Sequence, residues 1–239
     1  QHILAENYPF ATIDPNVGVV NVKDIRLDKL TEMYEPKKTI PTSYEFTDIA
    51  GLVRGASKGE GLGNKFLSHI RETDAIVEVV RCFDNGKIIH VDGNVDPIRD
   101  LETINLELII SDLEMVTNRL GKISKRALMS KDKQEKLEYE LLEKIKTTLE
   151  ASQPIRHMDF KDDELKLLKS YNFLTIKPII YVANIDEGMI GLEDNNYVKE
   201  VKEYARKENA SVVVLCAKIE EELSELSDSD KKDMLEALG

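Results

Sequence analysis

Residues 45–65 read EFTDIAGLVRGASKGEGLGNK, and this stretch carries the strongest indication of the fold. A short strand pattern ends at Asp48, and Gly51 completes an Asp-x-x-Gly sequence. In open α/β sheets, ligands bind beside the carboxyl ends of the strands. There an aspartate can hold a magnesium ion, and a glycine lets its backbone N–H approach a terminal phosphate. A simple strand-to-loop turn accounts for the pair about as well, so the motif alone leaves both interpretations open.

A glycine-rich run follows, with glycines at positions 55, 59, 61 and 63. Such a segment can order around a phosphate and relax afterwards, or it can be an ordinary surface loop. It is not a Walker phosphate cradle, because Phe66 stands after Lys65 where a serine or threonine is required. No Gly-x-x-x-x-Gly-Lys-[Ser/Thr] motif occurs anywhere in the 239 residues.

Apolar runs with little alternation predict strands over residues 75–83, 179–183 and 211–215. Such runs are typical of parallel strands that are covered on both faces. Shorter strand patterns occupy residues 17–22 and 44–47, and helical patterns occupy residues 65–73 and 197–207. The alternation predicts an α/β domain with a doubly wound, mostly parallel sheet.

Between residues 97 and 171 the pattern becomes helical. Leucine or alanine recurs every seven residues, with apolar side chains interleaved, at Leu106, Ile109, Leu113, Val116, Leu120, Ile123 and Ala127. A second stretch places Leu137, Leu141, Ile145 and Leu149 on one helix face. The polar segment 129–133 between them predicts an antiparallel coiled-coil hairpin. We therefore predict a nucleotide-binding domain of residues 1–96 and 172–239, interrupted by a hairpin domain of residues 97–171.

The composition is that of a globular protein, with 41% apolar and 33% charged residues. A net charge of −12 argues against nucleic-acid binding over the whole surface. Residues 119–150 are the exception, with nine basic and six acidic side chains. This hairpin region could neutralise RNA phosphates, although mixed-charge helices are usually only solvated. Cys82 and Cys216 each end a strand pattern and are expected to be buried free thiols in a reducing compartment.

Two longer stretches resemble a known family. Residues 7–18, NYPFATIDPNVG, look like the first switch of the Obg family of P-loop NTPases. Residues 48–74, DIAGLVRGASKGEGLGNKFLSHIRETD, closely resemble its YchF/Obg-like ATPase branch, and the resemblance covers essentially the whole chain. It implies a G-domain-like fold lacking its first strand. The P-loop strand and helix are expected ahead of Gln1, and a TGS domain after Gly239.

The resemblance also implies roles at the phosphate end of the site. Thr12 would ligate magnesium directly, Asp48 would do so through water, and the Gly51 N–H would contact the γ-phosphate. Without the family, Thr12 reads as a turn hydroxyl. Leu52 stands where Ras-like enzymes carry the glutamine that orients water. The family position that matches His90 bears a histidine proposed to orient that water, although an exposed loop histidine without catalytic work is as good a reading.

Base recognition is assigned to two segments by the same resemblance. Asn184-Ile185-Asp186-Glu187 replaces the Asn-Lys-x-Asp of GTPases, so the paired acceptor for guanine is displaced and ATP is favoured. Asp186 offers a carboxylate that could still reach guanine. Cys216-Ala217-Lys218 resembles the last nucleotide motif, a loop that flanks the base.

The sequence thus predicts a cytoplasmic ATPase that binds ATP and Mg²⁺, hydrolyses slowly and is regulated by a partner such as the ribosome, with no membrane association. The hairpin is the expected contact for ribosomal RNA. Two alternatives stay open: a GTPase of the wider Obg group, and a non-catalytic interaction module that binds through the hairpin. The sequence does not indicate an oligomeric state.

Overall fold

A computed structural model describes residues 16–49, 62–86, 88, 90, 93–129 and 132–238. The chain forms two compact units, Gln1–Gly51 and Leu52–Gly239. Within the described ranges, no helix has the length and apolar character needed to cross a membrane.

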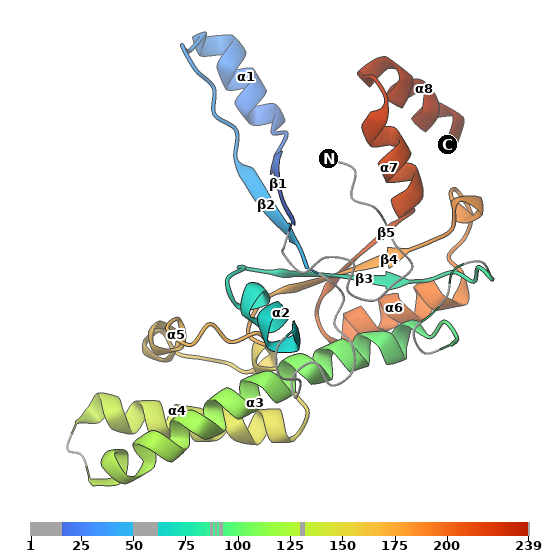
Figure 1. Ribbon diagram of the computed structural model, residues 1–239. Helices are drawn as coiled ribbons and strands as arrows, with labels where there is room; N and C mark the ends of the chain where they lie inside the picture. Colours follow the sequence, from blue (N-terminus) through green and yellow to red (C-terminus); the bar gives the residue numbers. More distant parts are fainter. Residues whose placement is uncertain are drawn as a thin grey trace. The chain divides into compact units, whose positions relative to one another are not determined.

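The first unit is a β-hairpin with a helix in its connection (Figure 1). β1 (Asn16–Asn21) and β2 (Ser43–Asp48) pair antiparallel, with Asn16 opposite Asp48. Both strands were predicted. α1 (Ile25–Tyr34) was not, and none of its residues is buried. Its N-terminus is fixed instead by Asp24, whose carboxylate accepts a hydrogen bond from the Arg26 N–H.

The second unit contains a parallel sheet in the order β3-β4-β5. Its strands are β3 (Ile76–Arg81), β4 (Ile179–Asn184) and β5 (Ser211–Leu215), as the continuous apolar runs predicted. α6 (Asn196–Lys207) connects β4 to β5 and packs with the first turns of α3 on one sheet face (Figure 1). The core between them is apolar and consists of Val80, Cys82, Leu101, Ile179, Tyr181, Ala183, Val198, Val201 and Ala205.

The opposite face of this sheet is more open. Val77 and Ile180 are register partners, as are Val79, Val182 and Val213 across the three strands. Val79 is 63% exposed, and Val77, Ile180 and Val213 are 37–45% exposed. The prediction of strands covered on both faces is therefore only half met among the described residues. The described strands form two separate sheets, β1-β2 and β3-β4-β5.

The helical hairpin is formed by α3 (Pro97–Met129) and α4 (Lys133–Glu150), which fold back on each other (Figure 1). The predicted seam is largely confirmed, because Val116, Leu120 and Ile145 are buried in one core with Ile109, Leu141, Leu142 and Leu149. The assignment of Leu106 to the seam was wrong, because this residue is 45% exposed. The reason is length: α3 has 33 residues and α4 only 18, so α4 does not reach back to Leu106.

The remaining helices are short. They are α2 (Leu62–Arg71), η1 (Ile155–His157), α5 (Asp162–Leu168), η2 (Glu187–Met189), α7 (Ala217–Glu225) and α8 (Asp228–Leu238). One buried carboxylate ties several of these parts together. Asp112 of α3 is fully buried and accepts hydrogen bonds from Arg71 Nη1, the Leu174 N–H, and the N–H and hydroxyl of Thr175. The last residue of α2 is thereby attached to the middle of α3. The proposed limits of the hairpin domain remain a prediction.

Candidate functional site

The carboxyl ends of the three parallel strands lie in register at one edge of the sheet. Arg81 of β3 pairs with Asn184 of β4, and Asn184 pairs with Leu215 of β5. The residue after β3 is also held to this edge, because Asn195 Nδ2 donates to the carbonyl of Cys82 at 2.7 Å. Sheets of this type bind ligands at this edge.

Two segments that are distant in sequence meet there. The backbone N–H of Ala217, the first residue of α7, donates to Asn184 Oδ1 at 3.0 Å. The Ile185 N–H donates to the Leu215 carbonyl at 2.9 Å. The loop after β4 and the loop after β5 therefore form one surface, as the two predicted base-recognition segments require.

The two acidic residues of the first segment are both engaged. Asp186 caps η2, and its Oδ1 accepts a hydrogen bond from the Gly188 N–H at 3.1 Å. Glu187 Oε2 lies 2.5 Å from Lys218 Nζ in an ion pair between η2 and α7. The hydrogen bond to Glu187 raises the pKa of Lys218 above its ordinary value, so the ammonium stays charged.

A cavity of about 390 Å³ lies beside these segments. Its walls come from the η2 region, the start of α6, the end of β5, and α7 and α8. They are mostly apolar and include Ile185, Leu192, Val214, Cys216, Ile219 and Leu235. Ile185 and Cys216, both predicted site residues, contribute to it. The sequence pattern did not predict this cavity, because its walls come from five separate elements.

His90 lies just before α3 and is held by that helix. Its Nε2 is 2.9 Å from Asp100 Oδ2, and its side chain is 15% exposed. Arg99 Nη2 contacts the other oxygen of Asp100 at 3.2 Å. A carboxylate on one ring nitrogen fixes the orientation of the imidazole. The structure thus places His90 in an oriented position, while its catalytic role stays a prediction.

The phosphate end of the predicted site is described only in part. Thr12, Gly51 and Leu52 lie outside the described residues. Asp48 is the last residue of β2, with an exposed side chain. Within the described ranges there is no group of three or more metal-ligating side chains. The magnesium role of Asp48 stays a prediction.

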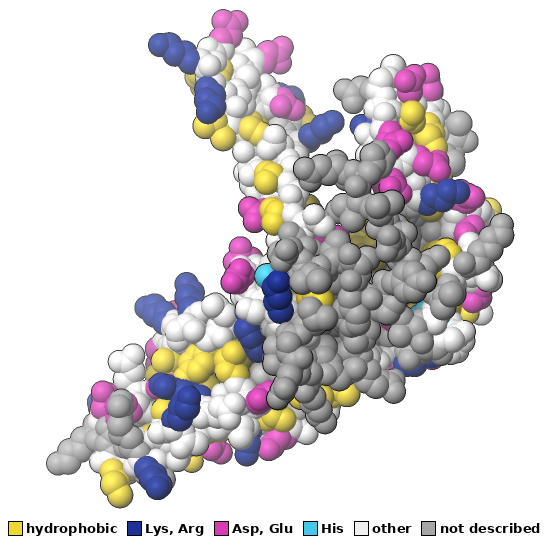
Figure 2. Space-filling model, in the orientation of Figure 1, with side chains coloured by type: hydrophobic (Ala, Val, Ile, Leu, Met, Phe, Trp, Pro, Cys, Tyr) yellow, Lys and Arg dark blue, Asp and Glu magenta, His cyan; other side chains and the backbone are white. Residues whose placement is uncertain are grey.

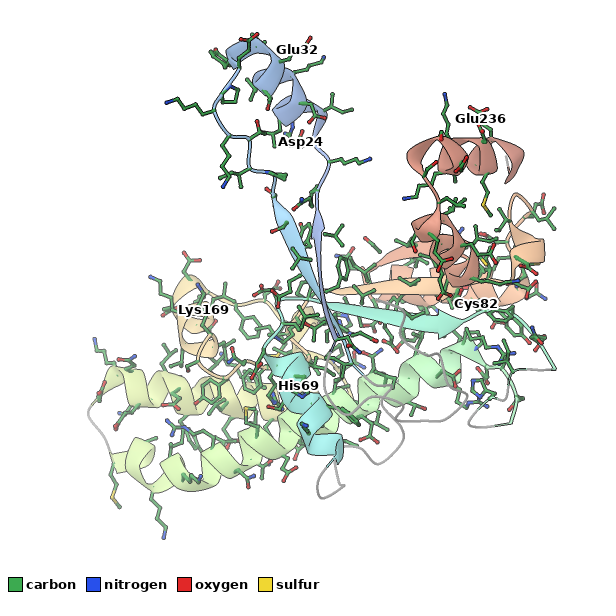
Figure 3. The ribbon with its side chains drawn as sticks, turned by 45° about the horizontal axis from the view of Figure 1, so that its top comes forward. Asp24, Glu32, His69, Cys82, Lys169 and Glu236 are labelled. Atoms are coloured by element: carbon green, nitrogen blue, oxygen red, sulfur yellow. The ribbon has the colours of Figure 1, made fainter. Side chains whose placement is uncertain are left out.

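The cysteines and the other described histidines do not form a catalytic centre. Cys82, labelled in Figure 3, is fully buried, and this burial raises the pKa of its thiol to about 12. Such a thiol is inert. Cys216 is buried and unpaired as well, so the prediction of buried free thiols is confirmed. His69 lies on α2 (Figure 3), and His157 Nε2 is 3.3 Å from Glu208 Oε2.

One buried polar network was missed by the sequence reasoning. Arg156 of η1 donates to Asn105 Oδ1 at 3.1 Å and to Glu208 Oε2 at 2.9 Å. Asn105 in turn donates to the hydroxyls of Tyr181 and Tyr204. These residues come from η1, α3, β4, α6 and the C-cap of α6, and no local pattern in the sequence joins them.

Comparison with known proteins agrees with this architecture. A family model described as 50S ribosome-binding GTPase matches residues 1–119. A Bacillus subtilis (strain 168) protein named ribosome-binding ATPase YchF is 56% identical over 98% of this chain and 64% of its own length. A Pasteurella multocida (strain Pm70) protein of the same name is 52% identical over 99% of this chain and 64% of its own length.

A solved structure gives the same result. It is titled "Structure of the Schizosaccharomyces pombe YchF GTPase", has a TM-score of 0.80 and 39% sequence identity, and covers 97% of this chain and 63% of that one. The chain therefore spans less than two thirds of the length of the relatives it matches. Together these comparisons show that nearly the whole of this chain is similar to proteins named YchF, and they support the α/β fold of a P-loop GTPase that carries a helical insertion.

Proposed function

We propose that this chain is the nucleotide-binding part of a slow ATPase that works as a switch on the ribosome. The observation that carries the proposal is the meeting of Asn184–Glu187 with Cys216–Lys218 at the carboxyl edge of the parallel sheet. The relatives' names, which state ribosome binding and ATPase activity, support it.

The base would be recognised by this pair of segments. Asn184 turns its side-chain oxygen to the Ala217 N–H. Its amide nitrogen is then the group that can donate to a ring nitrogen such as N7, which adenine and guanine share. Ile185 replaces the lysine of GTPases and lines the apolar cavity, so it offers the base an apolar contact.

Hydrolysis would be an in-line attack of water on the γ-phosphate. Asp48, with Thr12 and Gly51 as the family resemblance implies, would hold the magnesium ion and the terminal phosphate. When bound, the ion neutralises charge that develops on the phosphate oxygens. Leu52 cannot hydrogen-bond water, so an imidazole oriented by Asp100, that of His90, is the proposed water-positioning group.

The helical hairpin is the proposed contact for the ribosome. Lys122, Lys125, Lys133 and Lys136 are exposed near its tip. Figure 2 shows Lys and Arg side chains along the hairpin among Asp and Glu. Some of this charge is compensated, since Arg119 pairs with Glu138 and Lys146 with Glu150. Phosphate contacts of this kind weaken with salt, so ribosome co-sedimentation that falls with added salt, and falls further in Lys122→Glu/Lys125→Glu, is the expected result.

Nucleotide binding is tested by thermal unfolding of the complete gene product that contains these residues. A ligand at a hundred times its Kd stabilises the folded state by about 2.7 kcal/mol. For a domain of this size that raises the Tm by roughly 5–11 °C. No shift with ATP and Mg²⁺ would contradict the proposal.

The catalytic part is tested by two substitutions in the same protein. His90→Ala should lower the rate of ATP hydrolysis, whereas Leu52→Gln should leave it nearly unchanged, because water is placed from elsewhere. An unaltered rate in His90→Ala would show that the histidine does not act on the water.

A GTPase is the second candidate function. The matching family model and the solved relative are both described as GTPases. Competition between ATP and GTP for the complete protein separates the two functions, and a clear preference for GTP would favour the second. Ribosome binding without any nucleotide binding would favour a third function, that of a non-catalytic interaction module.

A further inference from the structure

The ion pair between Lys218 and Glu187 offers a physical basis for base selection. We propose that Lys218 is a specificity-determining residue, which disfavours guanine by holding the Glu187 carboxylate in an ion pair. This inference rests on the proposed function, because it explains which base that site accepts.

Guanine presents two adjacent donors, the N1–H and the 2-amino group. A carboxylate selects guanine by accepting from both, and this requires two available oxygens in one plane. Glu187 Oε2 instead accepts from Lys218 Nζ at 2.5 Å. The ammonium therefore competes with guanine for one of the two oxygens and holds the carboxylate toward α7.

The neighbouring carboxylate does not replace it. Asp186 Oδ1 accepts from the Gly188 N–H and fixes the first turn of η2. Moving this side chain toward a base would remove that cap. Both acidic side chains of the segment are thus engaged within the protein, and the Asn184 amide reads only what the two purines share.

The side-chain length at position 187 contributes to this base selection. Glu187 lies in η2 and Lys218 in the first turn of α7, and the carboxylate spans the space between them. An aspartate there would be one methylene shorter, so the lysine would hold it less well. The two residues therefore act as a unit, and each substitution should change selectivity in the same direction.

The energy of the Lys218–Glu187 ion pair is small. Lys218 and Glu187 are 60% and 50% exposed, so solvent screens the pair and it adds little to folding stability. Base selectivity depends on the difference between the binding free energies of the two bases, not on how much the ion pair stabilises the fold. Substituting Lys218 removes no buried contact, so the fold should be retained.

The test measures the Kd of ATP and of GTP in the complete gene product by equilibrium titration. Lys218→Met keeps the aliphatic stem and removes the charge. The ratio of the two dissociation constants should shift toward GTP by roughly two- to fivefold, the range that an exposed ion pair can supply. Lys218→Arg, which can keep the ion pair, should retain the original ratio.

A matched control comes from the same domain. Lys207 and Glu203 form another exposed pair at 3.3 Å on α6, so Lys207→Met removes an equal charge from a helix surface. It should leave the ratio unchanged. Glu187→Asp and the double variant Glu187→Asp/Lys218→Met complete a cycle, and their effects should be less than additive because they act on one contact.

The outcomes separate the inference from the proposed function. If the unsubstituted protein prefers ATP and Lys218→Met leaves the ratio within twofold, the inference is wrong and the proposed function stands. A preference of the unsubstituted protein for GTP overturns the ATPase assignment, and binding of neither nucleotide overturns both.

Discussion

Glu78 is an acidic side chain in the protein core, and its removal should change how stability depends on pH. It lies on β3, is 9% exposed, and its Oε2 has no hydrogen-bond partner in the described part of the chain. Burial raises the pKa of Glu78 from an ordinary 4.5 to about 8, with Arg156 opposing the shift and Asp100 adding to it. Glu78 is thus protonated in the folded protein at neutral pH.

The sign follows from proton uptake. Between pH 4.5 and about 8 the folded state holds a proton that the unfolded state has released. The stabilising contribution is complete below the unfolded pKa and is lost as pH rises through the folded one. The slope is about 1.36 kcal/mol per pH unit. Raising the pH by two units inside this window, from about 5.5 to 7.5, should therefore cost about 3 kcal/mol through this one group.

Glu78→Gln removes the titration and keeps the shape. Urea unfolding at the two pH values gives the free energy of unfolding for each protein. The variant should gain about 3 kcal/mol relative to the unsubstituted protein between the lower and the higher pH. Glu203→Gln, with an exposed carboxylate, is the control and should show little change. Parallel pH profiles for Glu78→Gln and the unsubstituted protein would refute the reasoning.

Three further substitutions test the packing around the sheet and the hairpin. Ile145→Ala, at a fully buried position of the hairpin core, should lower the free energy of unfolding in urea by about 2–5 kcal/mol, and a loss below 1 kcal/mol would mean that this core is loose. Asp112→Ala leaves Arg71 without its buried partner and should cost about 3–5 kcal/mol, measured by thermal unfolding; a neutral result would show that the joint is dispensable. Asn195→Ala removes the N-cap of α6 and its bond to the Cys82 carbonyl, so a loss of about 1 kcal/mol and faster amide exchange at Val198 are expected, whereas unchanged exchange would argue against the cap.

Much of the α/β architecture could be predicted because its signals are local. β5 begins and ends where the apolar run 211–215 does, and Val116 and Ile145 lie in the predicted seam. The heptad pattern was misleading at Leu106, because α4 does not extend that far and this part of α3 packs on the sheet instead. A heptad pattern contains no information about the length of the partner.

The candidate site was predictable only at the level of segments. The resemblance identified Asn184, Glu187 and Lys218, and the structure brings the three together. It did not reveal that Glu187 is paired with Lys218, because that contact joins residues 31 positions apart. The engagement of Asp186 as a cap was likewise absent from the pattern.

The continuous course of α3 has a mechanical consequence. The helix passes from the sheet core at Leu101 through the joint at Asp112 to the hairpin tip without a break. At 1.5 Å per residue, the part beyond Asp112 is a lever arm of roughly 26 Å. Because the helix is continuous, a tilt of about 10° of the whole of α3 would carry the tip roughly 4–5 Å relative to Asp112. Arg71 ends α2 and is bonded to Asp112, so a movement of α2 that tilts α3 would appear at the far end of the hairpin as a displacement of this size, enough to make or break a contact.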